Sequence, residues 1–170
     1  LLSGGGKSSG PLSFLKIYDD AAGSIKSGGK SRRAARMTTM RYHHPDIMAF
    51  IESKVREEIK ARVLMENGYE GGMDGEAVRT VTFQNTNFSV RLDDYFFEQL
   101  EKNGEVELKN VKSGEVSRKV SAEKMLKEIA FGSWRVGDPA VQYESKIQEM
   151  HTAKNSGRQN SSNPCSEYLF

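Results

Sequence analysis

"ARMTTMRYHHPDIMAFIESKVREEIKARVLMENG", residues 35–68, joins two different patterns in one run. Thr38 and Thr39 are β-branched and favour a strand near the beginning of this stretch. Pro45 suits the start of a helix, and Asn67-Gly68 is a typical end. Between them, apolar side chains recur at helical spacing, four residues apart, at Ile47, Ile51, Val55 and Ile59. The stretch therefore predicts a strand followed by an amphipathic helix, which is the repeating unit of α/β proteins.

The segments on both sides continue this alternation. Upstream, the apolar spacing predicts a helix from Pro11 to Lys26 that ends at Gly28 and Gly29. Downstream, we expect a short helix over 93–104, a β-hairpin over 105–120 that turns at Ser113-Gly114, a helix capped by Ser121, and a strand at 140–143. Met125, Ile129 and Trp134 are expected in the core. The order favours an α/β fold with some antiparallel pieces.

Residues 78–92, "VRTVTFQNTNFSVRL", are predicted to be extended because they are rich in Val, Thr and Phe. Polar residues from Gln84 to Asn87 occupy both faces of such a strand, which a plain core strand would not allow. We therefore expect this strand to face a polar interior.

Composition limits the possible classes of protein. The chain has 170 residues, a net charge of +2, and 36% hydrophobic and 28% charged residues, which suits one globular domain. A single cysteine excludes an internal disulfide framework, and the histidines do not have zinc-ligand spacing. No apolar run approaches the roughly 20 residues that span a bilayer, so we expect a cytoplasmic protein. There is no initiator Met, and both ends suggest cuts inside a larger domain.

Two glycine-rich segments carry basic residues. "SGGGKSSG" at 3–10 lacks the first glycine of a phosphate loop, so it is either an anion-attracting loop before a helix or a flexible connector. In the second segment, Gly28 and Gly29 allow close approach of a ligand to the backbone. Lys30, Arg32 and Arg33 follow them, and arginine suits phosphate. This segment is either a phosphate-contacting loop or a solvated basic surface.

The only cysteine stands in "SSNPCSE", residues 161–167. If this segment is extended, Asn163, Cys165 and Glu167 project to the same side. An amide, a thiol and a carboxylate would then share one face, where the carboxylate can move a proton and the thiol can act as a nucleophile or a hydrogen-atom donor. From spacing alone, an inert structural cysteine remains the alternative.

"SSNPCSE" resembles the active-site loop of ribonucleotide reductases, whose pattern is Asn-x-Cys-x-Glu. Four further segments resemble the family in the same order: residues 9–37, 43–51, 81–90 and 137–143. Pro164 and "GGKSRRAARM" at 28–37 are similar to the adenosylcobalamin-dependent class II enzymes. The resemblance implies a partial catalytic domain over 1–170, from a ten-stranded α/β barrel. Residues 1–10 would belong to the first specificity loop, 27–36 to the second, and 160–170 to the finger loop in the barrel centre.

The resemblance also implies a mechanism. Cys165 would become a thiyl radical that abstracts the 3′ hydrogen of a ribonucleotide, most simply a diphosphate. Glu167 would take the 3′-hydroxyl proton, and Asn163 would hold the ribose hydroxyls. The second specificity loop, with Gly28, Gly29, Lys30, Arg32 and Arg33, would pass the identity of a deoxynucleoside triphosphate effector to the substrate.

The implied partners are adenosylcobalamin, a thioredoxin-type reductant and a second copy of the chain that packs on the helix 11–26, with no nucleic acid or membrane. The reducing cysteines of the family are absent from these residues, so the chain alone is expected to be inactive. Two alternatives remain: a diiron-class reductase, and a phosphate- or nucleic-acid-binding module that uses the basic loop at 28–36.

Overall fold

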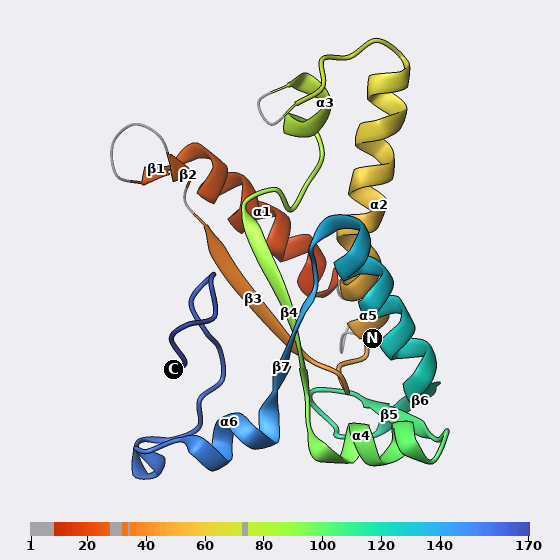
Figure 1. Cartoon of the computed structure of the whole chain (residues 1–170), viewed down its shortest axis with the longest axis vertical. Coiled ribbons are helices and arrows are strands. Elements are labelled where there is room, and N and C mark those ends of the chain that lie inside the picture. Colours follow the sequence, from red (N-terminus) through yellow and green to blue (C-terminus); the bar gives the residue numbers. More distant parts are fainter. Residues whose placement is uncertain (1–8, 28–31, 34, 73–74) are drawn as a thin grey trace.

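Three strands that lie far apart in the sequence form a parallel sheet in the computed structural model, which describes residues 9–27, 32–33, 35–72 and 75–170 (Figure 1). They are β3 (Arg36–Arg41), β4 (Thr86–Leu92) and β7 (Ala140–Tyr143), in that order across the sheet. Opposite residues align in rows, such as Arg41 with Arg91 and Arg91 with Gln142. The connections between the strands are mostly helical, which confirms the predicted α/β class.

Helices α2 (Ile47–Glu66) and α5 (Ala122–Val136) join the strands and pack against each other and one face of the sheet. The apolar residues of β4 meet them: Phe88 stacks on Phe50 of α2 with ring centroids 4.3 Å apart. The core also takes in Val90, Leu92, Ile47, Ile51, Met125 and Ile129. Burial of these side chains, at about 1.5–3 kcal/mol each, supplies most of the local stability.

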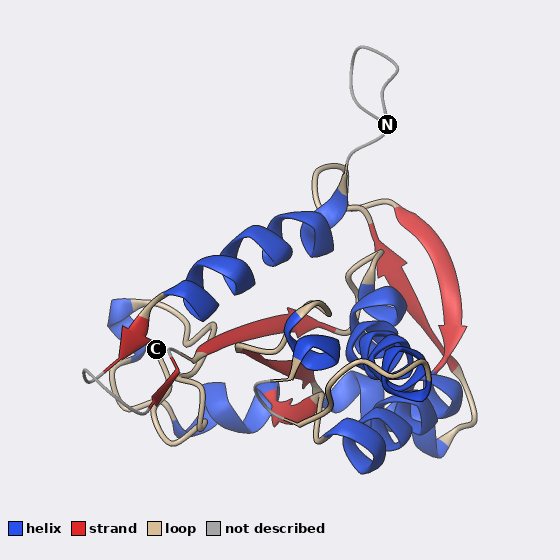
Figure 2. Ribbon diagram, turned by 90° about the horizontal axis from the view of Figure 1, so that it is seen from above, coloured by secondary structure: helices blue, strands red, loops and turns tan. Residues whose placement is uncertain are grey.

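The remaining elements lie around this centre. Helix α1 (Gly10–Ser24) runs beside the strands toward a short hairpin, β1 (Lys26–Ser27) with β2 (Arg32–Arg33) (Figure 2). The others are α3 (Glu76–Arg79), α4 (Asp94–Glu101), β5 (Glu105–Lys109), β6 (Val116–Ser121), α6 (Glu144–Met150) and a 3₁₀ turn at Lys154–Ser156. As predicted, β5 and β6 form an antiparallel hairpin, and Ser121 caps α5 by accepting a hydrogen bond from the Lys124 amide. None of the helices in the described parts of the chain combines the length and hydropathy of a membrane-spanning segment.

Two sequence predictions about these elements were wrong, and one helix was missed. Only 86–92 of the predicted extended stretch 78–92 is a strand, because its first residues form α3 and an irregular segment. Trp134 is 79% exposed, since it lies on the face of α5 away from Met125 and Ile129. Helix α6 was not expected, because it is short and has little apolar periodicity.

The irregular segment before β4 is explained by Asp19 of α1, which is 2% exposed. Its carboxylate accepts hydrogen bonds from the amides of Gln84 (3.1 Å) and Asn85 (2.9 Å) and from the Thr86 hydroxyl (2.8 Å). These amides therefore pair with a side chain and not with a neighbouring strand. Thus Gln84 and Asn85, which we expected to face a polar interior, instead fix α1 to the start of β4.

We predict that Asp19→Ala lowers the free energy of unfolding by roughly 3 kcal/mol or more, because each unsatisfied buried donor costs about 1–3 kcal/mol. Asp20→Ala is the matched control, since Asp20 is the exposed neighbour on the same helix. Denaturant unfolding of a protein that carries this chain measures both. Equal stability of the two variants would show that the Asp19 contacts contribute nothing.

The turn between β3 and α2 depends on a neutral histidine. Nδ1 of His44 accepts a hydrogen bond from the Asp46 amide at 3.0 Å, as expected for a residue near a helix start. Burial lowers the pKa of His44 from its ordinary 6.5 and outweighs the opposing effect of Asp46. Burial also lowers the pKa of His43, with a further contribution from Arg41.

We predict that the protein loses stability between about pH 7.5 and about pH 5.5. The folded pKa of both histidines lies below the unfolded value, so the unfolded chain binds protons first as the pH falls. His44→Asn keeps a hydrogen-bond acceptor that does not titrate, so the loss should become smaller. Denaturation midpoints across this range test the prediction, and an unchanged pH dependence in His44→Asn would contradict it.

Candidate functional site

The C-terminal loop (residues 158–170) carries the only cysteine of the chain at the tip of a hairpin-like turn. The Asn160 amide donates to the Phe170 carbonyl at 2.7 Å, and the Phe170 amide donates to the Ser161 carbonyl at 3.1 Å. Nearer the tip, the Asn163 amide donates to the Tyr168 carbonyl at 3.1 Å. These bonds close the loop so that Cys165 projects from its end, where it is exposed.

The tip is a turn and not an extended segment. The prediction that Asn163, Cys165 and Glu167 project to one side of an extended strand is therefore wrong. Ser166 has a φ of 62°, and its amide donates to the Asn163 carbonyl at 2.9 Å. The placement of Asn163, Cys165 and Glu167 relative to one another is therefore set by the turn. Cys165 and Glu167 are both exposed, and the described residues do not enclose the thiol in a sheltered cavity.

Asn163 has a fixed side-chain orientation. Its Oδ1 accepts a hydrogen bond from the Tyr168 amide at 2.9 Å, across the mouth of the turn. Within the described part of the chain, its Nδ2 makes no hydrogen bond, so this group is available to donate to another molecule. The amide therefore both closes the loop and presents a donor at the tip.

The loop lies on the face of the sheet opposite the helices, which is polar. Thr39 Oγ1 donates to the Asn160 carbonyl at 3.1 Å, Gln142 Nε2 donates to Ser162 Oγ at 2.8 Å, and Asn87 Nδ2 donates to the Pro164 carbonyl at 2.8 Å. Of the polar residues 84–87 that were expected to face a polar interior, only Asn87 lies on this face, where Ser89 and Arg91 of the same strand accompany it. These alternate with the apolar Phe88, Val90 and Leu92, and this period of two is the signal that identifies the face.

Beneath the loop lies an ionic cluster that the sequence analysis missed, formed by Arg41, Arg91, Glu144 and Arg158. Arg91 is 1% exposed, and its Nε lies 2.5 Å from Glu144 Oε2. This contact is an ion pair without hydrogen-bond alignment, and among the described residues both terminal guanidinium nitrogens of Arg91 also lack hydrogen-bond partners. Burial lowers the pKa of Arg91, while Glu144 opposes that shift. No local sequence feature marks Glu144, because its partners come from three other segments.

The loop tip lies at the same end of the sheet as the β1–β2 hairpin, which includes Arg32 and Arg33. Asn87, which holds Pro164, stands opposite Met37, next to Arg36 at the start of β3. Figure 1 shows the C-terminal loop beside β3, with its turn directed toward the β1–β2 hairpin. In that hairpin Arg32 pairs with Ser27 along the backbone and Arg33 with Lys26. The predicted residues Gly28, Gly29 and Lys30 lie outside the described residues.

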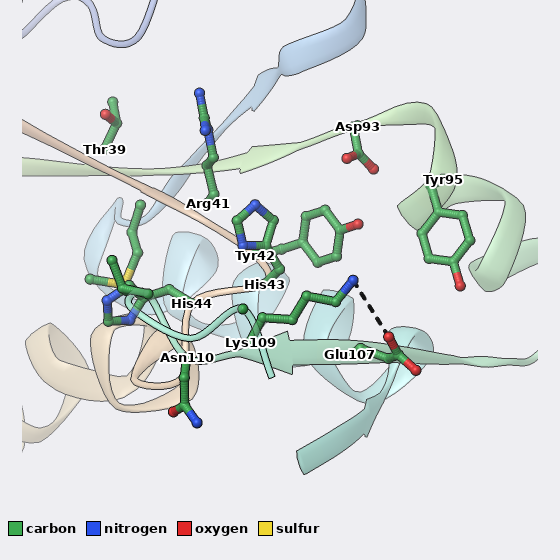
Figure 3. A pocket seen from close by; sticks show the side chains of 13 residues that line it. Thr39, Arg41, Tyr42, His43, His44, Asp93, Tyr95, Glu107, Lys109 and Asn110 are labelled. Atoms are coloured by element: carbon green, nitrogen blue, oxygen red, sulfur yellow. Dashed lines mark ion pairs between the residues drawn. The ribbon is translucent and has the colours of Figure 1, made fainter. Parts of the chain in front are cut away.

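One hollow, of about 640 Å³, borders the loop and is formed by β7, α6 and the tip; Glu167, Ser166, Gln142 and His151 are among its lining residues. Another, of about 790 Å³, lies where β3 and β4 end, and its lining includes Glu107 and Lys109 of β5 (Figure 3). There burial, followed by the nearby carboxylate of Asp93, raises the pKa of the Tyr42 phenol. Within the described residues, no three His, Cys, Asp or Glu side chains gather closely enough to hold a metal ion.

Comparisons with known proteins agree with the resemblance. The family model described as "Ribonucleotide reductase, barrel domain" matches residues 1–170. A vitamin B12-dependent ribonucleotide reductase of Rhodopirellula baltica is 48% identical over 99% of this chain and 16% of its own length. That of Streptomyces avermitilis is 45% identical over 99% of this chain and 18% of its own. A vitamin B12-dependent ribonucleoside-diphosphate reductase of Thermoplasma acidophilum is 35% identical over 95% of this chain and 18% of its own.

The chain thus spans about a sixth of the length of these relatives, and the family model matches all of its residues. The match covers the parallel sheet, the α1 segment and the C-terminal loop alike. The chain therefore belongs to the barrel-domain family of ribonucleotide reductases.

Proposed function

We propose that this chain forms the radical-bearing part of an adenosylcobalamin-dependent ribonucleotide reductase, which converts ribonucleotides to 2′-deoxyribonucleotides for DNA synthesis. The observation that carries the proposal is the exposed thiol of Cys165 at the tip of a closed loop, next to Asn163 and Glu167. The names of the relatives favour cobalamin over a diiron centre. Some of them are named diphosphate reductases, which favours ribonucleoside diphosphates as substrates.

The exposed tip fits an external radical donor, because a donor must approach the sulfur within contact distance. When bound, adenosylcobalamin supplies an organic radical by cleavage of its cobalt–carbon bond. Among the described residues, we assign only Cys165 to this chemistry, as the hydrogen-atom donor. Other parts of a full-length reductase would hold the corrin ring and exclude water from the thiyl.

Each residue of the tip then has a role in the reaction. The Cys165 thiyl takes the 3′ hydrogen of the ribose, and Glu167 accepts the proton of the 3′ hydroxyl. The 2′ hydroxyl leaves as water, and a pair of thiols outside this chain supplies the two electrons of the reduction. Asn163 donates from Nδ2 to a ribose hydroxyl, in the orientation that its bond to the Tyr168 amide fixes. The hydrogen returns from Cys165 to the 3′ carbon at the end of the cycle.

We propose that the other predicted regions control and complete the enzyme. Residues 27–36 serve as the specificity loop for a deoxynucleoside triphosphate effector, since their end adjoins the loop tip through β3. The face of α1 with exposed Phe14, Ile17 and Tyr18 suits contact with a second copy in a homodimer. A thioredoxin-type protein is the expected source of electrons.

In a full-length enzyme that carries this segment, Cys165→Ser should lower turnover by at least about 10³-fold, because serine cannot form an equivalent radical. Hydrogen exchange between the 5′ carbon of the cofactor and solvent should be lost as well. Turnover is measured as deoxynucleotide formed with adenosylcobalamin and no separate metal subunit. Activity that requires a metal subunit would favour the diiron class, and an active Cys165→Ser would disprove the thiyl role.

Glu167→Gln should lower kcat by about 10²–10⁴-fold, because the amide cannot accept the proton of the 3′ hydroxyl. The KM for the nucleotide should change little, since the side chain keeps its size and one of its acceptor oxygens. Steady-state kinetics with Glu149→Gln as the surface control separate the two effects. A fall in affinity without a fall in kcat would assign Glu167 to binding instead of proton transfer.

A further inference from the structure

We propose that Glu144 is a positioning residue that holds the C-terminal loop on the sheet and thereby sets the location of Cys165. Glu144 is the first residue of α6, directly after β7, and is 7% exposed. Within the described residues, its hydrogen bonds and ion pairs do not include the thiol or any other side chain of the loop tip. This inference rests on the proposed function, because the position of Cys165 matters only if the sulfur does chemistry.

One carboxylate joins three arginines from three segments. Arg91 Nε of β4 lies 2.5 Å from Glu144 Oε2, and Arg158 of the loop donates to Oε1 at 2.5 Å. Arg41 of β3 lies 3.8 Å from the same Oε1 and also donates to Asn160 Oδ1 at 3.1 Å. The carboxylate thus connects two strands of the sheet to the base of the loop.

A second contact one helical turn later holds the same part of the loop. Gln148 Nε2 donates to the Gln159 carbonyl at 2.6 Å, and Gln148 Oε1 accepts from the Gln159 amide at 3.3 Å. Gln148 also donates to Glu144 Oε1 at 3.3 Å. Residues 158 and 159 are therefore held by side chains on one face of α6. The orientation of that helix depends on Glu144.

The charge balance makes this carboxylate hard to replace. Arg91 is almost completely buried, and its terminal guanidinium nitrogens have no hydrogen-bond partner within the described parts of the chain. Without Glu144, three positive charges would lie close together with no anion between them, and one would be buried without compensation. We expect the exposed member, Arg158, to move away first and to release the base of the loop.

Displacement at the base would reach the tip. From Asn160 to Pro164 the loop is held by hydrogen bonds from side chains of β3, β7 and β4 in turn, and the lengths of these bonds depend on the loop's register. A shift of the base lengthens these bonds and moves the turn that carries Cys165. Misplacement of a reacting group by about 1 Å can lower a rate by about 10²-fold.

The test uses the full-length enzyme with Glu144→Gln, which keeps the size of the side chain and removes its charge. We expect kcat to fall by about 10–100-fold while the KM for the nucleotide stays within about 2-fold. Glu144→Asp keeps the charge and should recover part of the lost kcat. Glu149→Gln is the matched control on the same helix, because Glu149 forms only an exposed pair with Lys146; it should behave as the wild type.

Arg158→Gln provides a second route, because Arg158 is exposed and its loss leaves Glu144 paired with Arg91. It should lower kcat in the same way, and the double variant with Glu144→Gln should be no worse than Glu144→Gln alone. Hydrogen exchange of the peptide 158–170 should be faster in both single variants than in the wild type. This second measurement needs no activity and remains informative if Glu144→Gln folds poorly.

A wild-type kcat in Glu144→Gln, or additive effects in the double variant, would overturn the positioning role. An equal loss in Glu149→Gln would overturn it too, because the effect would then belong to any charge on α6. Failure of the proposed function has a different signature: the wild-type enzyme itself would not reduce ribonucleotides. In that case exchange at 158–170 would still decide whether Glu144 holds the loop.

Discussion

The ion pair between Arg91 and Glu144 links the two faces of the structure. β4 packs Phe88, Val90 and Leu92 against the helices and turns Arg91 to the opposite side. A buried guanidinium is tolerated only with an anion beside it, and the start of α6 supplies that anion. The position of α6, and with it the path of the chain into the C-terminal loop, therefore depends on a charge carried by the central strand.

This constraint explains why the polar face of the sheet can hold a loop that has few apolar contacts. Thr39, Asn87 and Gln142 each donate a hydrogen bond to the loop, and each comes from a different strand. The strands are themselves kept in register by the core on the other face. A loop attached at several points to a rigid surface keeps its tip in place better than one attached at its ends alone.

The sequence predicts what depends on local periodicity and capping. The helices at 10–24, 47–66 and 122–136 and the hairpin at 105–121 follow from apolar spacing and turn residues. The irregular segment at 80–85 does not, because its amides bind Asp19, a residue distant in sequence. Cys165 was located from its pattern, but the turn around it was not, since backbone hydrogen bonds between 160–163 and 168–170 determine it. The contacts of Glu144 could not be predicted from the sequence, because they form only when β4 and β7 lie side by side in the folded sheet.

The groups that hold the C-terminal loop in place and the groups that are proposed to react lie at different ends of the loop. Charged groups lie under the base of the loop, where Arg91 and Glu144 are shielded from water, whereas Cys165 and Glu167 are exposed at the tip. In the proposed reaction Cys165 exchanges hydrogen atoms with two different molecules, so its thiol must be reachable from outside its own chain. A buried thiol would be well placed but inaccessible, and a thiol on a free loop would be accessible but poorly placed. The ionic cluster resolves this conflict because it fixes the loop at a distance from the sulfur, leaving the tip open to both reaction partners.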